Sequence, residues 1–144
     1  MKTKTYKAHN MKTAPLILTL LIGILPCLLT GCQTQRDNSQ KSLIDIIKHF
    51  DDNGLKVTVI QPSFAKAIKA QEGCQLTIDG SNIEIYRYNL KEPEQAEKLR
   101  QIHKDGYIDI LSIKFEVNIN GPFLMLHGNS HPDNVKIIEV FDSF

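Results

Sequence analysis

Cysteine is scarce in this sequence, and the common catalytic signatures are missing from it. The chain has three cysteines among 144 residues. It lacks Gly-x-Ser-x-Gly, a phosphate-binding glycine loop and His-Glu-x-x-His. The commoner hydrolase and nucleotide-binding activities are therefore not indicated, and no cofactor is expected. We predict that the protein is not an enzyme.

The sequence does contain a long apolar run close to its beginning. Residues 14–29 carry no charge, and four lysines precede them: Lys2, Lys4, Lys7 and Lys12. A basic segment followed by an apolar run is typical of a secretory signal peptide. The run is shorter than the roughly 20 residues that a membrane-spanning helix needs, and Pro26 interrupts it. We therefore expect a cleavable signal and not a permanent span.

A small residue and a cysteine follow this run. The stretch Leu29-Thr30-Gly31-Cys32 resembles the lipobox of bacterial prolipoproteins. The resemblance covers residues 1–32 only. It implies a lipid (diacylglycerol, palmitate-type acyl chains) on Cys32, cleavage just before it, and recognition through Leu29, Thr30 and Gly31. It also implies anchoring in the cell envelope of a bacterium.

The residue after Cys32 bears on which membrane holds the anchor. Prolipoproteins kept at the inner membrane of diderm bacteria commonly carry an aspartate there, and this chain has Gln33. The resemblance thus implies the outer membrane, facing the periplasm, in a diderm host and the outer face of the cytoplasmic membrane otherwise. Cys27 is a poorer lipidation site because Pro26 precedes it. Met11 is an alternative start for the signal.

Without residues 1–31 the balance of charge changes. These residues hold four of the 17 basic residues and no acidic one, which leaves 13 basic against 16 acidic residues and a formal net charge of −3. Nucleic acid is therefore not an expected partner. The remaining 113 residues suit one domain. We predict a flexible tether over residues 32–41 and a single globular domain over residues 42–144.

Periodicity predicts the elements of this domain. Ser42 and Asp45 are typical of a helix start, and the apolar spacing that follows indicates a helix over 42–52 that ends at Asn53-Gly54. A strand is expected over 55–60. A short helix is expected over 62–70, with three side chains pointing inward: Phe64, Ala67 and Ile68.

The rest of the chain nearly repeats itself. Leu76–Gly80, an apolar stretch and a helix led by Pro93 align with Val117–Gly121, an apolar stretch and a helix led by Pro132. Each copy indicates a β-hairpin followed by a helix, although any two such units look alike. The predicted fold class is α+β: helix, strand and short helix, then two strand-strand-helix units. These elements form a largely antiparallel sheet of about five strands with helices on one face.

Cys74 and three polar side chains are the candidates for chemistry. Cys74 heads an alternating strand pattern, so a packed core residue is the preferred interpretation over a reactive thiol. His127 and His131 are four residues apart, with Asp133 nearby, but Gly128, Asn129, Ser130 and Pro132 indicate a loop there and not one helical face. These three form a weak candidate metal site.

Glu84, Tyr86 and Tyr88 share one face of a predicted strand and form a candidate contact surface. The alternative is that residues 104–111 cover them, and burial is the preferred interpretation. Our leading hypothesis is a lipid-anchored, non-catalytic domain that contacts another envelope protein. The alternatives are a small extracytoplasmic enzyme or metal-binding protein using His127, His131 or Cys74, and a solute-binding lipoprotein with a shallow site.

Overall fold

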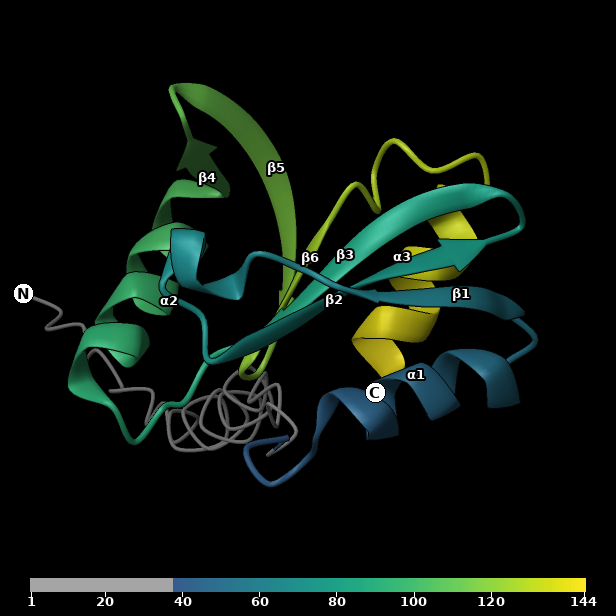
Figure 1. Cartoon of the computed structure of the whole chain (residues 1–144), viewed down its shortest axis with the longest axis horizontal. Coiled ribbons are helices and arrows are strands. Elements are labelled where there is room, and N and C mark those ends of the chain that lie inside the picture. The colour runs from purple at the N-terminus through teal and green to yellow at the C-terminus, as the bar shows by residue number, and fades with distance from the viewer. Residues whose placement is uncertain (1–37) are drawn as a thin grey trace, which may run out of the picture. The chain divides into compact units, whose positions relative to one another are not determined.

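The computed structural model describes residues 38–144 (Figure 1). The elements are α1 (Leu43–Asp52), β1 (Val57–Pro62), a 3-10 helix η2 (Ala65–Ile68), β2 (Glu72–Ile78), β3 (Ser81–Arg87), α2 (Pro93–Asp105), β4 (Tyr107–Ile110), β5 (Ile113–Asn120), β6 (Phe123–Leu126) and α3 (Asn134–Ser143). The predicted signal peptide and lipobox lie outside the described residues.

The six strands form one open sheet in the order β1-β2-β3-β6-β5-β4, and all neighbouring strands are antiparallel. The predicted α+β class with an antiparallel sheet is confirmed, with one strand more than expected. The additional strand is β4. It pairs with β5 through a turn at Leu111-Ser112. This turn contains neither glycine nor asparagine, the residues that usually indicate a tight hairpin turn in a sequence.

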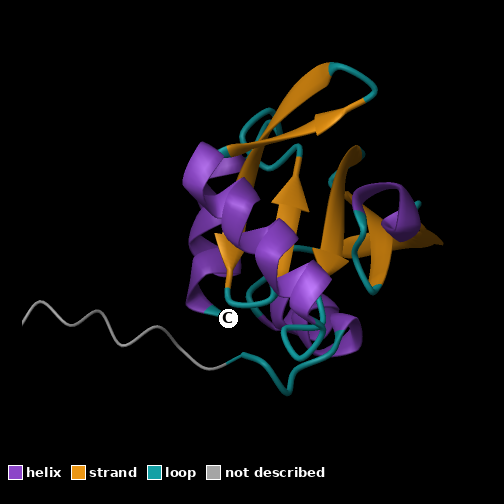
Figure 2. Ribbon diagram, turned by 90° about the vertical axis from the view of Figure 1, so that its left-hand side faces the viewer, coloured by secondary structure: helices purple, strands orange, loops and turns teal. Residues whose placement is uncertain are grey.

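Helices cover both faces of the sheet, which corrects the expectation that they lie on one face. Helices α1 and α3 pack with one set of strand side chains, including Ile83 and Ile85. Helix α2 and η2 pack with the opposite set, including Tyr86 and Tyr88. Figure 2 shows α2 in front of the sheet. Because both faces of β3 are apolar or aromatic, each face requires a cover.

The predicted helix start at Ser42 and Asp45 is confirmed. The Ser42 hydroxyl accepts a hydrogen bond from the Asp45 amide at 3.3 Å, and the Ser42 amide donates to the Asp45 carboxylate at 2.8 Å. This hydrogen bonding lowers the pKa of Asp45. The helix ends where predicted, and Gly54 adopts a left-handed φ of 74°.

The predicted helix over 62–70 is largely wrong. Strand β1 extends to Pro62, which pairs with Cys74, and the Ser63 amide still bonds to the Gly73 carbonyl. Only one 3-10 turn therefore fits before β2. Ala65 and Ile68 point inward as the turn closes, whereas Phe64 is exposed.

The two predicted strand-strand-helix units are present, as β2-β3-α2 and β5-β6-α3. Their helices pack on opposite faces of the sheet, so the units are not related by a simple superposition of hairpin and helix. The second helix buries Ile137, Val140 and Phe141, and its Val135 is exposed.

Residues 38–41 belong to the domain and not to a flexible tether. Asn38 is buried, and its side-chain amide donates to the Asn120 side-chain oxygen at 3.1 Å. Arg87 donates to the Lys41 carbonyl at 2.7 Å and to the Ser39 carbonyl at 3.2 Å. Polar bonds hold this segment, which is why a search for apolar residues assigned it to the tether.

Candidate functional site

Four residues of the predicted lipobox, Leu29, Thr30, Gly31 and Cys32, lie outside the described residues. The other sequence candidates fall inside them. Each can therefore be assessed by what it touches and by how far it is exposed.

His131 is a structural residue. It is buried, and its Nε2 lies 3.0 Å from the Ile78 carbonyl oxygen. Its Nδ1 accepts a hydrogen bond from the Asp133 amide at 3.0 Å. A carbonyl can only accept, so Nε2 carries the proton and the ring is a neutral tautomer with both nitrogens engaged. No lone pair is left for a metal.

His127 lies apart from this arrangement. It has a left-handed φ of 65°, and its ring meets Phe115 edge to face with 5.6 Å between ring centroids. Within residues 38–144, no group of three or more His, Cys, Asp or Glu side chains is arranged to hold a metal ion. The structure does not assemble His127, His131 and Asp133 into a ligand set.

Cys74 is a buried core residue, as the alternation predicted. It packs among the side chains that α1 and α3 cover. Burial, with a smaller contribution from the negative charge of Glu72, raises the pKa of its thiol to about 11. The nucleophilic thiolate is therefore a minor species near neutral pH.

Glu84, Tyr86 and Tyr88 share one face, but the two tyrosines are buried, so the predicted contact surface is wrong and the burial interpretation is confirmed. The Tyr88 hydroxyl donates to the Ile68 carbonyl at 3.1 Å. The Tyr86 hydroxyl donates to the Glu84 carboxylate and lies 2.5 Å from the Ser63 hydroxyl. Burial, together with this bond to Glu84, raises the pKa of Tyr86.

A glycine in the neighbouring strand makes room for the ring of Tyr86. Gly73 pairs with Tyr86 across β2 and β3. A Cβ at Gly73 would lie 2.5 Å from the Tyr86 ring. The aromatic ring therefore lies directly over glycine backbone, as in other sheets where an aromatic side chain covers a glycine. This contact locks Tyr86 into the core.

Two exposed apolar side chains lie close together at the end of the β4–β5 hairpin, which we call the hairpin tip (Leu111, Ser112 and Ile113). Leu111 is 93% exposed and Ile113 is 59% exposed. The hairpin projects from the rest of the domain at the top of Figures 1 and 2. This site was not predicted from the sequence, because the exposure of the tip depends on β4, and that strand was not predicted either.

The backbone of the hairpin tip is unfavourable for its own residues. Leu111 and Ser112 have φ values of 53° and 67°, as the two central positions of a tight hairpin turn require. Asparagine and glycine adopt these angles most easily, whereas leucine pays roughly 1 kcal/mol. A bond from the Ser112 amide to the Asp109 carboxylate at 2.9 Å supports the turn. Leu111 therefore occupies an exposed position at which a leucine lowers stability.

The stem of the hairpin has two different faces. Ile110 pairs with Ile113 and Ile108 pairs with Phe115, so these apolar side chains share the face that continues into the core under α2. The opposite face is polar, with Asp109 paired to Lys114. The Lys114 ammonium lies 4.2 Å from the centre of the Tyr107 ring. The stem is therefore anchored while the tip is free to make contacts.

No protein-family model, curated protein or solved structure matches this chain. Among the described residues, no helix is both long enough and apolar enough to cross a bilayer.

Proposed function

We propose that this protein is a lipid-anchored lipoprotein of the bacterial cell envelope, and that its globular domain is non-catalytic and binds another envelope protein. The anchor is Cys32, which the lipobox resemblance assigns as the acylated residue. With Gln33 at the next position, the proposed location is the outer membrane, facing the periplasm, when the host is diderm. In a monoderm host it is the outer face of the cytoplasmic membrane.

The observation that carries the binding role is the leucine of the hairpin tip. Leu111 is exposed and lies in a left-handed backbone that other residues adopt at lower cost. Stability alone would favour asparagine or glycine there. A contact with an apolar pocket of a partner gives leucine a function at this position.

The position of the hairpin tip supports the same role. Strand β5 begins at the tip with Ile113 and ends with Asn120, which bonds to Asn38 near the point where the chain enters the domain. Eight residues of strand span roughly 23 Å. In an anchored protein the tip thus lies at the far end of β5 from the tether and is accessible to another protein.

The structural roles of the rival residues support a non-catalytic domain. Cys74 is a core thiol, and both ring nitrogens of His131 bond to the backbone. Neither residue is in a position to act on a substrate in this conformation. No observation favours the enzyme or metal-binding alternative over a binding role.

Replacing the hairpin tip tests the proposal. The double change Leu111→Asn and Ser112→Gly supplies the residues that the turn prefers, so we expect the free energy of unfolding to rise by about 1 kcal/mol. Removal of the leucine should reduce in-cell crosslinking to the envelope partner roughly tenfold. Stability and binding would then change in opposite directions.

The matched control is Val135→Asn on α3, since Val135 is 75% exposed and lies outside the hairpin. This variant should retain wild-type crosslinking. Crosslinks would be mapped by mass spectrometry of the captured complex. Equal capture by the tip variant and by the control would overturn the hairpin tip as the binding site.

A further inference from the structure

We infer that the surface around Asn38, where the chain enters the domain, lies against the headgroup layer of the bilayer that holds the lipid anchor. We call this surface the entry surface, and it consists of Gln40, Ile44, Lys48, Leu90 and Lys91. The inference rests on the proposed lipidation of Cys32. It adds a second contact to the lipid anchor and fixes the orientation of the domain.

The entry point itself is fixed on the domain. Asn38 is buried against the β5–β6 turn, where an added Cβ on Gly121 would lie 3.3 Å from the Asn38 Cβ. The Arg87 guanidinium binds the carbonyls of Ser39 and Lys41. The Lys41 ammonium donates to the Phe144 carbonyl at 3.1 Å and lies 3.9 Å from the centre of the Phe144 ring. The chain therefore leaves the domain at one defined place.

Covalent geometry limits the distance between this place and the bilayer. Six peptide units separate Cys32 from Asn38, and they span at most roughly 20 Å. Strand β5, which separates the entry point from the hairpin tip, spans roughly 23 Å and is therefore longer than this reach. The bilayer can reach surfaces beside Asn38, but it cannot reach the hairpin tip without a large tilt of the domain.

The exposed side chains beside the entry point suit a headgroup layer. Ile44, in the first turn of α1, is 77% exposed, and Leu90, three residues after Arg87, is 44% exposed. Each has a lysine close by. Lys48 lies one turn after Ile44 on α1, and Lys91 follows Leu90 directly. Aliphatic side chains beside lysines with long apolar stems are typical of surfaces that lie on membranes.

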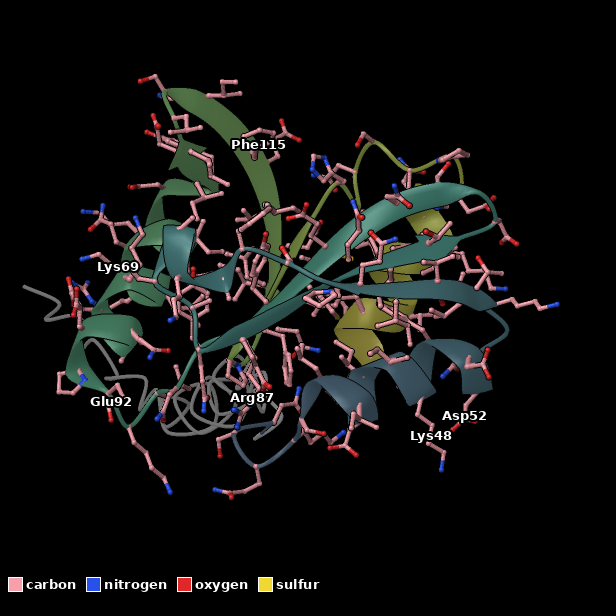
Figure 3. The ribbon with its side chains drawn as sticks, in the orientation of Figure 1. Lys48, Asp52, Lys69, Arg87, Glu92 and Phe115 are labelled. Atoms are coloured by element: carbon pink, nitrogen blue, oxygen red, sulfur yellow. The ribbon has the colours of Figure 1, made fainter. Side chains whose placement is uncertain are left out.

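Acidic groups at this end are also present. Asp45 caps α1 through Ser42, and Glu92 precedes α2. Figure 3 shows Lys48, Arg87 and Glu92 along the same end of the domain, with the hairpin tip at the opposite end. Because charges of both signs occur here, the attraction comes from shallow insertion of Ile44 and Leu90 and not from a strongly basic patch. The occupant is thus the lipid interface, and an anionic lipid is not required.

Site-specific fluorescence quenching tests this orientation. The probe is bimane on a single introduced cysteine, Ile44→Cys, Leu90→Cys or Leu111→Cys, in the full lipidated chain. Cys74 is buried and does not compete for the label under native conditions. The protein is reconstituted in phosphatidylcholine vesicles that contain lipid with a nitroxide on its headgroup. We expect fluorescence to fall at least twofold at positions 44 and 90 and by less than a tenth at position 111.

The inference is overturned by equal quenching at all three positions, or by quenching at position 111 without quenching at 44 and 90. Absence of quenching at every position overturns it as well, since the entry surface then faces solvent or a protein. Intact mass of each purified chain separates this failure from failure of the proposed function. A chain without lipid on Cys32 refutes the anchor, whereas a lipidated chain with the wrong quenching pattern refutes the orientation alone.

Discussion

His131 and His127 are close in sequence and have different physical roles. His131 supplies a donor to the Ile78 carbonyl and an acceptor to the Asp133 amide, both in buried or half-buried positions. Removal of the ring leaves both backbone groups without their partner. The expected loss of stability is about the desolvation free energy of two polar backbone groups left without a hydrogen-bond partner.

We therefore expect His131→Ala to lower the free energy of unfolding by about 3 kcal/mol. The control is His127→Asn, which keeps a residue that tolerates the left-handed backbone and should change stability by less than about 1 kcal/mol. Urea denaturation followed by circular dichroism measures both. Similar losses in the two variants would contradict the structural role of His131.

Cys74 makes the stability of the folded domain depend on pH in the alkaline range. Its thiol has a pKa of about 11 in the folded protein against 9.0 for the unperturbed group. The folded state therefore disfavours the thiolate. The contribution of Cys74 to stability is complete below pH 9 and is lost as the pH rises through 11, because only the unfolded chain gains from early deprotonation.

Comparison with Cys74→Ala isolates this effect, since the buried tyrosines titrate in both chains. Between pH 8 and pH 11 the wild type should lose about 2 kcal/mol more of its free energy of unfolding than the variant loses. Chemical denaturation at a series of pH values provides the measurement. Parallel pH profiles for the two chains would show that Cys74 is accessible to solvent.

At the scale of elements, the arginine at the end of β3 holds the entry segment. Arg87 bonds to Ser39 and Lys41, and it also reaches Gln71 at 2.7 Å. Asn38 and Lys41 make further bonds to Asn120 and to the Phe144 carbonyl. Arg87 is therefore one of several side chains that hold the segment, and it alone among them bonds to two of its carbonyl groups.

Arg87→Gln should release the segment and increase the rate of tryptic cleavage after Lys41 roughly tenfold, because cleavage requires local opening. Arg100→Gln is the control, since Arg100 is exposed and pairs with Glu97 on its own helix. Mass spectrometry of limited digests follows the cleavage. An unchanged rate in Arg87→Gln would mean that other contacts hold the segment.

The elements also show which parts of the fold were accessible from sequence. Helix α1 was predicted because its capping residues and its apolar period are local signals. Strand β4 was not predicted, because the turn before β5 places Leu111 and Ser112 at positive φ angles, and neither residue type indicates such a turn. The entry segment was missed for another reason. Its bonds to Arg87 and Asn120 join residues that are far apart in the chain.

The candidate site depends on the same nonlocal information. Tyr86 and Tyr88 were placed on the correct face of their strand, but which face is covered depends on where α2 packs. The exposure of the hairpin tip depends on the pairing of β4 with β5. Alternation along a strand predicts that two faces differ, and the packing of distant helices decides which side chains remain in contact with solvent.

At the scale of the whole molecule, the chain entry and the hairpin tip lie at opposite ends of one domain. The chain enters beside Asn120 at one end of β5, and the hairpin tip projects at the other end (Figure 1). The proposed anchor at Cys32 would give the domain a fixed orientation on the membrane. The entry surface would lie on lipid while the tip extends toward a protein partner.

Acylation of Cys32 is the central claim, and labelled palmitate tests it most directly. The full chain and a Cys32→Ser variant are expressed in a bacterium with labelled palmitate, and the incorporated label and the size of the product are measured. The account predicts label on the wild-type chain at the processed size, and an unlabelled, unprocessed Cys32→Ser chain. Equal labelling of the two chains, or no label on the wild type, would contradict it.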